Sequence, residues 1–191
     1  PDNWKELNEH PSKPMVNRAI NGAYPPGSTF KPFMALAALE MGKRTPNQAI
    51  SDPGYFNFGN HQFRDDKKGG HGSVDMYKSI VHSCDTYYYM LANDMGIDNI
   101  SKFMGSLGLG QRTGVDLGKD DSGESKGVLP SQERKKQRFK KPEQQKWYAG
   151  ETISIGIGQG YNAYTPIQLA QATAVVANNG VMFRPHLVNQ I

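Results

Sequence analysis

Apolar positions along this chain recur mainly with the spacing of helices rather than with the alternation typical of strands. The clearest example is residues 28–41, where a proline-glycine turn leads into an apolar stretch from Phe30 to Leu39. Gly42 follows at the position where many helices end in a glycine. Pro32 fits only the first turn of such a helix, where its missing N–H has no helical acceptor. The pattern therefore predicts a helix that begins at residue 28.

Similar signals predict further helices. Residues 73–95 form two apolar pieces that meet near Ser83, and the second piece ends at Gly96. A short helix is expected over 98–107, and a capping box with proline at its first position opens an alanine-rich helix over 165–180. These elements predict a mixed α/β fold that is strongly helical and has few strands.

The remaining segments are polar or rich in turn residues. Residues 1–23 form a polar approach segment, and positions 15–20 at its end are compatible with a short strand. Residues 45–72 contain repeated proline and glycine and are expected to be loop, and residues 112–150 are turn-rich and charged. At 191 residues and 37% apolar content, the chain is long enough for one domain with a sizeable core.

Composition excludes some classes of protein. No apolar stretch is long enough to cross a bilayer, and no signal peptide opens the chain, which we expect to be a piece of a longer protein. Cys84 is the single cysteine, so an internal disulfide is excluded and the redox compartment stays open.

The net charge of +4 is concentrated in one segment. Residues 133–146 hold seven basic and two acidic side chains, and only Phe139 interrupts them with an aromatic ring. Nucleic-acid surfaces usually interleave basic and aromatic residues or present a basic helix face. We therefore expect a solvated, mobile loop here and no nucleic-acid partner.

The run from Tyr24 to Pro32 contains the strongest candidate for chemistry. Ser28 and Lys31 are three residues apart, so on a helix they share one face. A lysine there can act as the base for a serine nucleophile if burial or a neighbouring cation keeps its amine neutral. The helix N-terminus also favours developing negative charge. The spacing alone is equally typical of an ordinary turn that leads into a helix with a surface lysine.

Other motifs follow Ser28 and Lys31 in a definite order: Ser83-Cys84-Asp85, Gly156-Ile157-Gly158-Gln159-Gly160 and Thr165-Pro166-Ile167-Gln168. In this order they closely resemble the transpeptidase domain of class B penicillin-binding proteins, above all the elongation type of Gram-negative bacteria. The resemblance covers nearly the whole chain. It implies the fold shared by penicillin-binding proteins and serine β-lactamases, and it implies acyl transfer.

The resemblance also implies a role for each residue of the site. Ser28 would attack the D-Ala-D-Ala carbonyl of a peptidoglycan stem peptide, and Lys31 would accept its proton. Ser83 would relay protons between Ser28, Lys31 and the leaving amine. Asp85 stands where many relatives have asparagine, and an ionised carboxylate there can only accept hydrogen bonds.

The glycine-rich motif is not expected to bind a cofactor. Tyr161 stands where a dinucleotide fingerprint needs its third glycine, so residues 156–160 are predicted to be a packed backbone turn. The resemblance further implies β-lactams as inhibitors, a glycan polymerase and rod-complex scaffold proteins as partners, and a periplasmic location in a protein anchored to the inner membrane.

One family motif is missing from the chain. Lys-Thr-Gly or Lys-Ser-Gly should follow the glycine-rich motif, and Arg112-Thr113-Gly114 precedes it, so we interpret that triplet as an ordinary loop. We expect a partial transpeptidase domain that lacks C-terminal sheet strands and has weak or no turnover. Its predicted parts are the approach segment 1–23, the nucleophile helix and helical subdomain 24–180, and the start of the sheet region 181–191.

A metal site is a further hypothesis. Asp52, Asp65, His71 and Cys84 carry side chains that bind zinc, but their spacing matches no compact zinc motif. They resemble an Asp, Asp, His, Cys set that some elongation-type relatives use for structural zinc. The alternative is a small buried cysteine beside a solvated loop.

Other functions remain open from the sequence. A β-lactamase or D,D-carboxypeptidase shares the Ser-x-x-Lys spacing, although no Glu-x-x-x-Asn deacylation motif follows Ser83. A β-lactam sensor would be acylated without turnover, and in a plain helical binding module Ser28 would be inert. Acylation of Ser28 by a penicillin would separate the last of these from the others.

Overall fold

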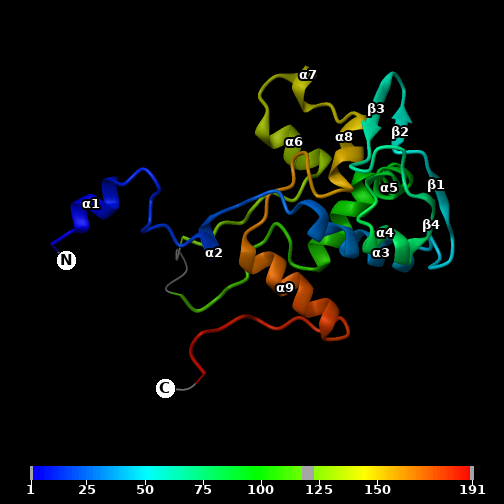
Figure 1. The fold of residues 1–191 in the computed structure, drawn as a ribbon. Helices are drawn as coiled ribbons and strands as arrows, with labels where there is room; N and C mark the ends of the chain where they lie inside the picture. The colour runs from blue at the N-terminus through cyan, green and yellow to red at the C-terminus, as the bar shows by residue number, and fades with distance from the viewer. Residues whose placement is uncertain (1, 118–122, 190–191) are drawn as a thin grey trace. The chain divides into compact units, whose positions relative to one another are not determined.

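The structure is a computed structural model that describes residues 2–117 and 123–189 (Figure 1). Residues 118–122, which belong to the predicted turn-rich segment 112–150, lie outside the described part. The chain divides into two compact units, each built from separate stretches of sequence. Unit 1 comprises Pro1–Tyr24, Leu107–Val128 and Ala163–Ile191, and unit 2 comprises Pro25–Ser106 and Leu129–Asn162.

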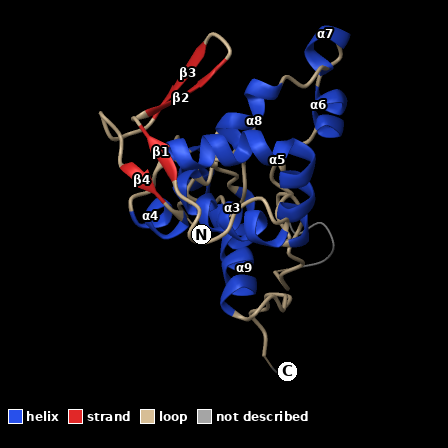
Figure 2. Cartoon of the chain, turned by 90° about the vertical axis from the view of Figure 1, so that its right-hand side faces the viewer, coloured by secondary structure: helices blue, strands red, loops and turns tan. Residues whose placement is uncertain are grey.

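Helices dominate the described residues (Figure 2). In unit 2 they are η1 (Gly27–Phe30), α3 (Lys31–Glu40), α4 (Met76–Val81), α5 (Asp85–Ser106), α6 (Gln132–Arg138), α7 (Pro142–Gln145) and α8 (Ala149–Ile155). In unit 1 they are α1 (Trp4–Glu9), α2 (Arg18–Asn21) and α9 (Pro166–Ala177).

The described strands all belong to unit 2 and form two antiparallel ladders. β1 (Ile50–Asp52) pairs with β4 (Gly72–Val74), and β2 (Tyr55–Phe58) pairs with β3 (His61–Arg64). The expected loop over 45–72 is therefore wrong. Its glycines and prolines mark the turns between strands, whereas Phe56 and Phe63 face each other as a cross-strand pair.

The nucleophile helix forms as predicted. A short 3₁₀ turn begins at Gly27 and ends at Phe30, and α3 continues it directly with Pro32 in its first turn. The helix ends at Glu40, and Gly42 beyond it has φ of 62°, the left-handed conformation that glycine adopts without strain. The buried face of α3 packs against α5, which builds the core of unit 2 around these two helices.

Two predicted helical pieces, α4 and α5, meet around Ser83. Ser83 itself has φ of 54°, which is unusual for a residue other than glycine. Gly96 interrupts α5 with non-helical torsion angles (φ 74°, ψ 158°), at the place where the sequence predicted an end. The residues beyond it continue as a second helical piece to Ser106.

The glycine-rich motif packs α8 tightly against α5. An added Cβ at Gly156 would lie 2.5 Å from the backbone oxygen of Tyr88 and 2.7 Å from Ala92 Cβ. The backbones therefore approach more closely than any side chain would permit. This contact confirms the prediction that the motif serves packing.

Two further expectations are wrong. The short strand expected over 15–20 is replaced by α2. The Asn17 side chain accepts a hydrogen bond from Ala19 N–H and so caps this helix, which buries Ile20. The basic segment 133–146 is largely helical rather than a loop, because Ser131 caps α6 through the N–H of Arg134.

Unit 1 contains the Arg112-Thr113-Gly114 triplet, held by a buried glutamate. One Glu124 carboxylate oxygen accepts hydrogen bonds from Thr113 N–H (2.6 Å) and Thr113 Oγ1 (2.7 Å), and the other accepts from Gly114 N–H (3.1 Å). The predicted capping box at Thr165 and Gln168 also forms and opens α9. Among the described residues, no helix combines the length and apolar character needed to span a membrane.

Replacing Gly156 by alanine tests the close contact between α8 and α5. We expect the free energy of unfolding to fall by about 1–3 kcal/mol, because the new Cβ meets backbone atoms that cannot rotate away. Urea unfolding followed by circular dichroism measures the change. Gly105→Ala is the control, since its nearest neighbour is a Leu129 methyl group at an ordinary 3.5 Å. Equal stability of the two variants would contradict the packing argument.

Candidate active site

Three segments of unit 2 bring the predicted catalytic residues together. Ser28 lies in η1 and Lys31 begins α3, so the helical spacing places both on one face. Ser83 lies in the link between α4 and α5, and Asp85 is the first residue of α5. Because α3 packs on α4 and α5, residues more than 50 positions apart meet here.

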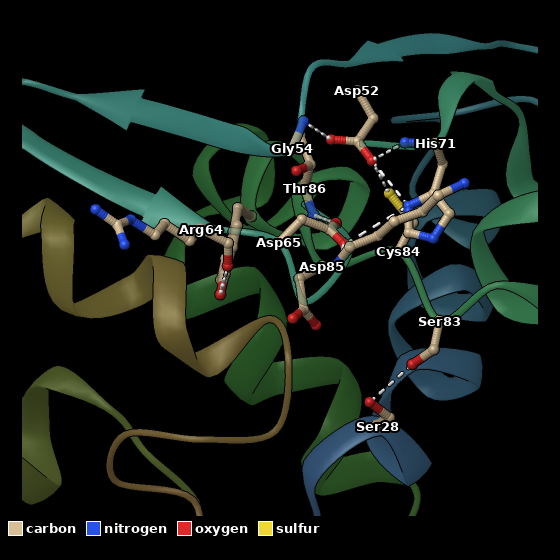
Figure 3. Close-up of polar contacts among 12 residues, drawn as sticks. Ser28, Asp52, Gly54, Arg64, Asp65, His71, Ser83, Cys84, Asp85 and Thr86 are labelled. Atoms are coloured by element: carbon tan, nitrogen blue, oxygen red, sulfur yellow. Dashed lines mark hydrogen bonds and ion pairs between the residues drawn. The ribbon is translucent and has the colours of Figure 1, made fainter. Parts of the chain in front are cut away.

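A continuous chain of hydrogen bonds joins these four side chains. Ser83 Oγ lies 2.9 Å from Ser28 Oγ (Figure 3). Lys31 Nζ lies 2.9 Å from Ser83 Oγ. Lys31 Nζ also donates to the Ser83 carbonyl oxygen at 2.5 Å and to Asp85 Oδ1 at 2.6 Å. Ser83 therefore bridges the serine and the lysine, which is the relay position that the family resemblance implied for it.

Lys31 is buried although its side chain ends in an ionisable amine. The residue is only 2% exposed, and its Nζ lies 5.7 Å from the centre of the Tyr88 ring. Its three donated hydrogen bonds are the full capacity of an ammonium group. Asp85 supplies the compensating negative charge, without which burial of the cation would be strongly unfavourable.

The turn that presents Ser28 rests on the glycine-rich motif. Gly27 has φ of 56°, and its N–H donates to the Gly158 carbonyl oxygen at 3.0 Å. A Cβ at Gly158 would lie 2.2 Å from the Gly27 oxygen. Sequence reasoning assigned the motif to packing but did not detect this contact, because the two glycines are 131 positions apart. The signal available in the sequence was the repeated glycine itself.

A second cluster of side chains adjoins the Ser83–Asp85 motif. It consists of the four predicted metal ligands, Asp52, Asp65, His71 and Cys84, whose ligand atoms all lie within 4.8 Å of one another. His71 Nδ1 is 2.9 Å from Asp52 Oδ2 and 3.5 Å from Asp65 Oδ1. Cys84 Sγ is 3.4 Å from Asp52 Oδ2. Their side chains are buried, so the structure brings together the residues that the sequence hypothesis named.

The protonation of this cluster follows from its burial and its donors. Burial alone would raise the pKa of Asp52, but hydrogen bonds that include the N–H groups of Gly54 and His71 lower it to about 2. Burial also opposes ionisation of Asp65, yet donors such as the Thr86 N–H bring its pKa below the usual range. Burial, together with the neighbouring carboxylates, raises the pKa of the Cys84 thiol.

The cluster and the catalytic residues share one stretch of backbone. Cys84 stands between Ser83 and Asp85, and Thr86 N–H donates to Asp65 Oδ2 at 2.9 Å (Figure 3). Other histidines were weaker ligand candidates in the sequence. His82 stacks on His71 with ring centres 5.5 Å apart, and His61 lies against Phe63 in the β2–β3 ladder.

Known proteins share both the sequence and the fold. The family model for the penicillin binding protein transpeptidase domain matches residues 1–191. Peptidoglycan D,D-transpeptidase MrdA of Acinetobacter baumannii is 49% identical over 187 residues, which are 97% of this chain and 27% of the relative. This chain therefore spans little more than a quarter of that relative's length.

Solved structures agree with the sequence matches. Pseudomonas aeruginosa PBP2 in complex with WCK 5153 has a TM-score of 0.89 at 44% identity, covering 99% of this chain and 40% of that one. Helicobacter pylori PBP2 in complex with MreC has a TM-score of 0.87 at 37% identity, covering 97% of this chain and 33% of that one. The expected mixed, strongly helical transpeptidase fold is thus confirmed. With the family model matched over all 191 residues, the chain belongs to the penicillin-binding protein transpeptidase family.

Proposed function

We propose that this chain carries the acylation centre of a serine-type peptidoglycan D,D-transpeptidase. The observation that supports this most strongly is the hydrogen-bonded series Ser28, Ser83, Lys31 and Asp85. It provides a nucleophile at a helix N-terminus and a lysine that is linked to it through one hydroxyl group. It also provides a negative counter-charge for that buried lysine. The substrate is a stem peptide that ends in D-Ala-D-Ala.

Acylation begins with attack of Ser28 Oγ on the carbonyl carbon between the two D-alanines. Lys31 acts as a base only in its neutral form, so its ammonium first releases one proton to solvent. The Ser28 proton then passes to the Lys31 amine through the Ser83 hydroxyl. The N–H of Ser28, in the first turn of η1, would supply one donor to the oxyanion that forms. Collapse of the tetrahedral intermediate leaves an ester on Ser28.

The ammonium form of Lys31 serves the second half of acylation. As described, Lys31 donates to Ser83, and Ser83 Oγ in turn lies within hydrogen-bonding distance of Ser28. This direction of donation carries a proton from Lys31 through Ser83 to the nitrogen of the departing D-alanine. The amine of a second stem peptide then attacks the ester and releases Ser28, which forms the cross-link.

Asp85 has a positioning role in this scheme. Its carboxylate is 2.6 Å from Lys31 Nζ and holds the lysine toward the Ser83 hydroxyl. An asparagine at this position would donate as well as accept, whereas the carboxylate only accepts, here from Lys31 Nζ. β-Lactams would acylate Ser28 by the same attack and block the site.

We also propose that Asp52, Asp65, His71 and Cys84 hold a structural zinc ion. Two carboxylates, an imidazole and a thiol are a donor set that zinc accepts, with four protein ligands and no open position. A cation would balance the two buried carboxylates and would allow the Cys84 thiol to ionise. Such an ion would fasten the β1–β4 ladder to the start of α5.

The remaining context rests on the relatives. We propose that the chain works on the periplasmic side of an inner-membrane-anchored protein. The Helicobacter pylori relative was solved in complex with MreC, which supports a rod-complex scaffold protein as a partner. A glycan polymerase partner is proposed from the family resemblance.

Labelling with a fluorescent penicillin tests the nucleophile. We expect a stable adduct on the peptide that contains Ser28, and we expect Ser28→Ala to abolish it. Ser83→Ala should slow labelling by about 10²–10⁴-fold, because general acid–base relay contributes on that order. Thr29→Ala is the control, since its hydroxyl bonds the Pro26 carbonyl and not the catalytic series.

Four outcomes of that experiment distinguish the candidate functions. An adduct that survives Ser28→Ala would refute the nucleophile. Transfer of the acyl group to an added D-amino acid would support a synthase, whereas a stable adduct without transfer would favour a β-lactam sensor. Rapid hydrolysis of the adduct would favour a β-lactamase or carboxypeptidase.

Replacing Gly158 by alanine tests the support of the nucleophile turn. We expect acylation by penicillin to slow by at least about tenfold, because displacement of Gly27 moves Ser28 out of its attacking geometry. Stopped-flow labelling measures the rate. Gly59→Ala is the matched control, with φ of 56° and no atom within 4 Å of the added Cβ. Normal acylation by Gly158→Ala would show that the Gly27–Gly158 contact does not position Ser28.

Elemental analysis and thermal unfolding test the zinc proposal. Protein purified without chelators should contain one zinc per chain, and a strong chelator should lower its Tm by at least about 5 °C. Cys84→Ser should bind zinc less tightly and respond less to chelator. Absence of zinc, or equal Tm with and without chelator, would refute a structural metal.

A further inference from the structure

A strongly basic segment of unit 2 lies outside the catalytic series. We call residues 132–146 the basic arm; it comprises α6, the turn after it, α7 and Lys146. The arm holds seven of the chain's 22 basic residues but two of its 18 acidic ones. Its exposed basic side chains are Lys136, Arg138, Lys140, Lys141 and Lys146.

The basic arm is anchored at its base by a buried lysine. Lys135 is 8% exposed and forms an ion pair with both carboxylate oxygens of Glu151 in α8, at 2.5 and 2.6 Å. Its Nζ also donates to the Lys146 carbonyl oxygen and lies within 6 Å of the ring centres of Trp147, Tyr148 and Tyr161. Both ends of the arm are therefore tied to one point, and the exposed charges are held outward by a fixed base.

The anchor connects the arm to the nucleophile turn through a single short helix. Glu151 lies in the first turn of α8, and Gly158, which supports Gly27, follows the other end of that helix. Seven helical residues span about 10 Å, so the base of the arm lies about one helix length from the turn that presents Ser28. Figure 1 shows α6 and α7 beside α8, on the side away from α4.

The composition of the arm favours one class of anion. Neither α6 (QERKKQR) nor α7 (PEQQ) offers a large apolar side chain that could insert into a lipid surface. Bases of a nucleic acid would need a row of stacking rings, and within the arm Phe139 is the single aromatic residue. Separate exposed cations without a hydrophobic strip suit a hydrated polymer that carries carboxylates at intervals.

We propose that the basic arm binds the free carboxylates of peptidoglycan strands and so holds the polymer beside the acylation centre. This inference rests on the proposed function, because it assigns the arm to the same polymeric substrate. The binding is electrostatic and occurs outside the catalytic series, so it adds affinity for long strands without altering attack by Ser28.

Co-sedimentation with purified peptidoglycan sacculi tests the proposal. A variant with Lys136, Arg138, Lys140 and Lys141 all changed to glutamine should bind sacculi at least about tenfold more weakly at low salt, because several weak exposed pairs are lost together. The control changes four exposed lysines elsewhere in unit 2 to glutamine, namely Lys43, Lys67, Lys68 and Lys102. It should bind within about twofold of the parent.

Two further experiments, with amidated sacculi and with lipid vesicles, identify the ligand. Converting the carboxylates of the sacculi to neutral amides should abolish the difference between parent and arm variant. Binding that survives amidation, equal losses in the arm and control variants, or tighter binding to phosphatidylglycerol vesicles than to sacculi would each overturn the proposal.

Penicillin labelling separates this test from the test of the proposed function. The arm variant should label at the parental rate, which also shows that it is folded. If the parent itself is not labelled at Ser28, the acylation centre fails while the binding result stands by itself. If labelling is normal and sacculus binding does not depend on the arm, only the present inference fails.

Discussion

The buried cation of Lys31 is the constraint on which the catalytic geometry depends. A lysine that is 2% exposed must find partners for every N–H and a counter-charge nearby, or the fold loses several kcal/mol. Asp85 provides the charge, and Ser83 provides both a carbonyl and a hydroxyl oxygen. The electrostatic requirement of folding therefore fixes the same atoms that the proposed acylation chemistry needs.

A steric constraint acts on the nucleophile from the other side. Gly27 and Gly158 approach so closely that a side chain on Gly158 would collide with the Gly27 backbone, while one hydrogen bond holds the pair together. Ser28 is thus fixed between a polar contact to Ser83 and a backbone contact to the glycine-rich turn. Together the two contacts hold the exposed Ser28 from both sides, which favours a preorganised attack geometry.

Local signals in the sequence predicted the elements that carry the site. Contacts between residues far apart in the sequence could not be predicted in this way. The Ser28–Lys31 spacing, the break at Ser83 and the capping box at Thr165 depend on neighbouring residues and were predicted correctly. The β1–β4 ladder was missed because its paired residues lie 20 to 24 positions apart. The β2–β3 hairpin is local, but its strands are short and its glycine turn was interpreted as part of a loop. The helix of the basic segment was missed although its N-cap, Ser131, is a local signal. The ion pair that also holds it, Lys135 with Glu151, joins residues 16 positions apart and gives no local signal.

The proximity of the acidic cluster to the catalytic series has a structural cause in Ser83 and its neighbours. Ser83 has φ of 54°, a conformation that costs a non-glycine residue about 1 kcal/mol or more. Contacts on both sides hold it there: the ion pair of Asp85 with Lys31, and the contact of Cys84 with Asp52. We therefore expect that loss of the Cys84–Asp52 contact would let Ser83 relax and would weaken its contact with Ser28. Stability of the cluster and reactivity of the serine are therefore coupled through one residue of backbone.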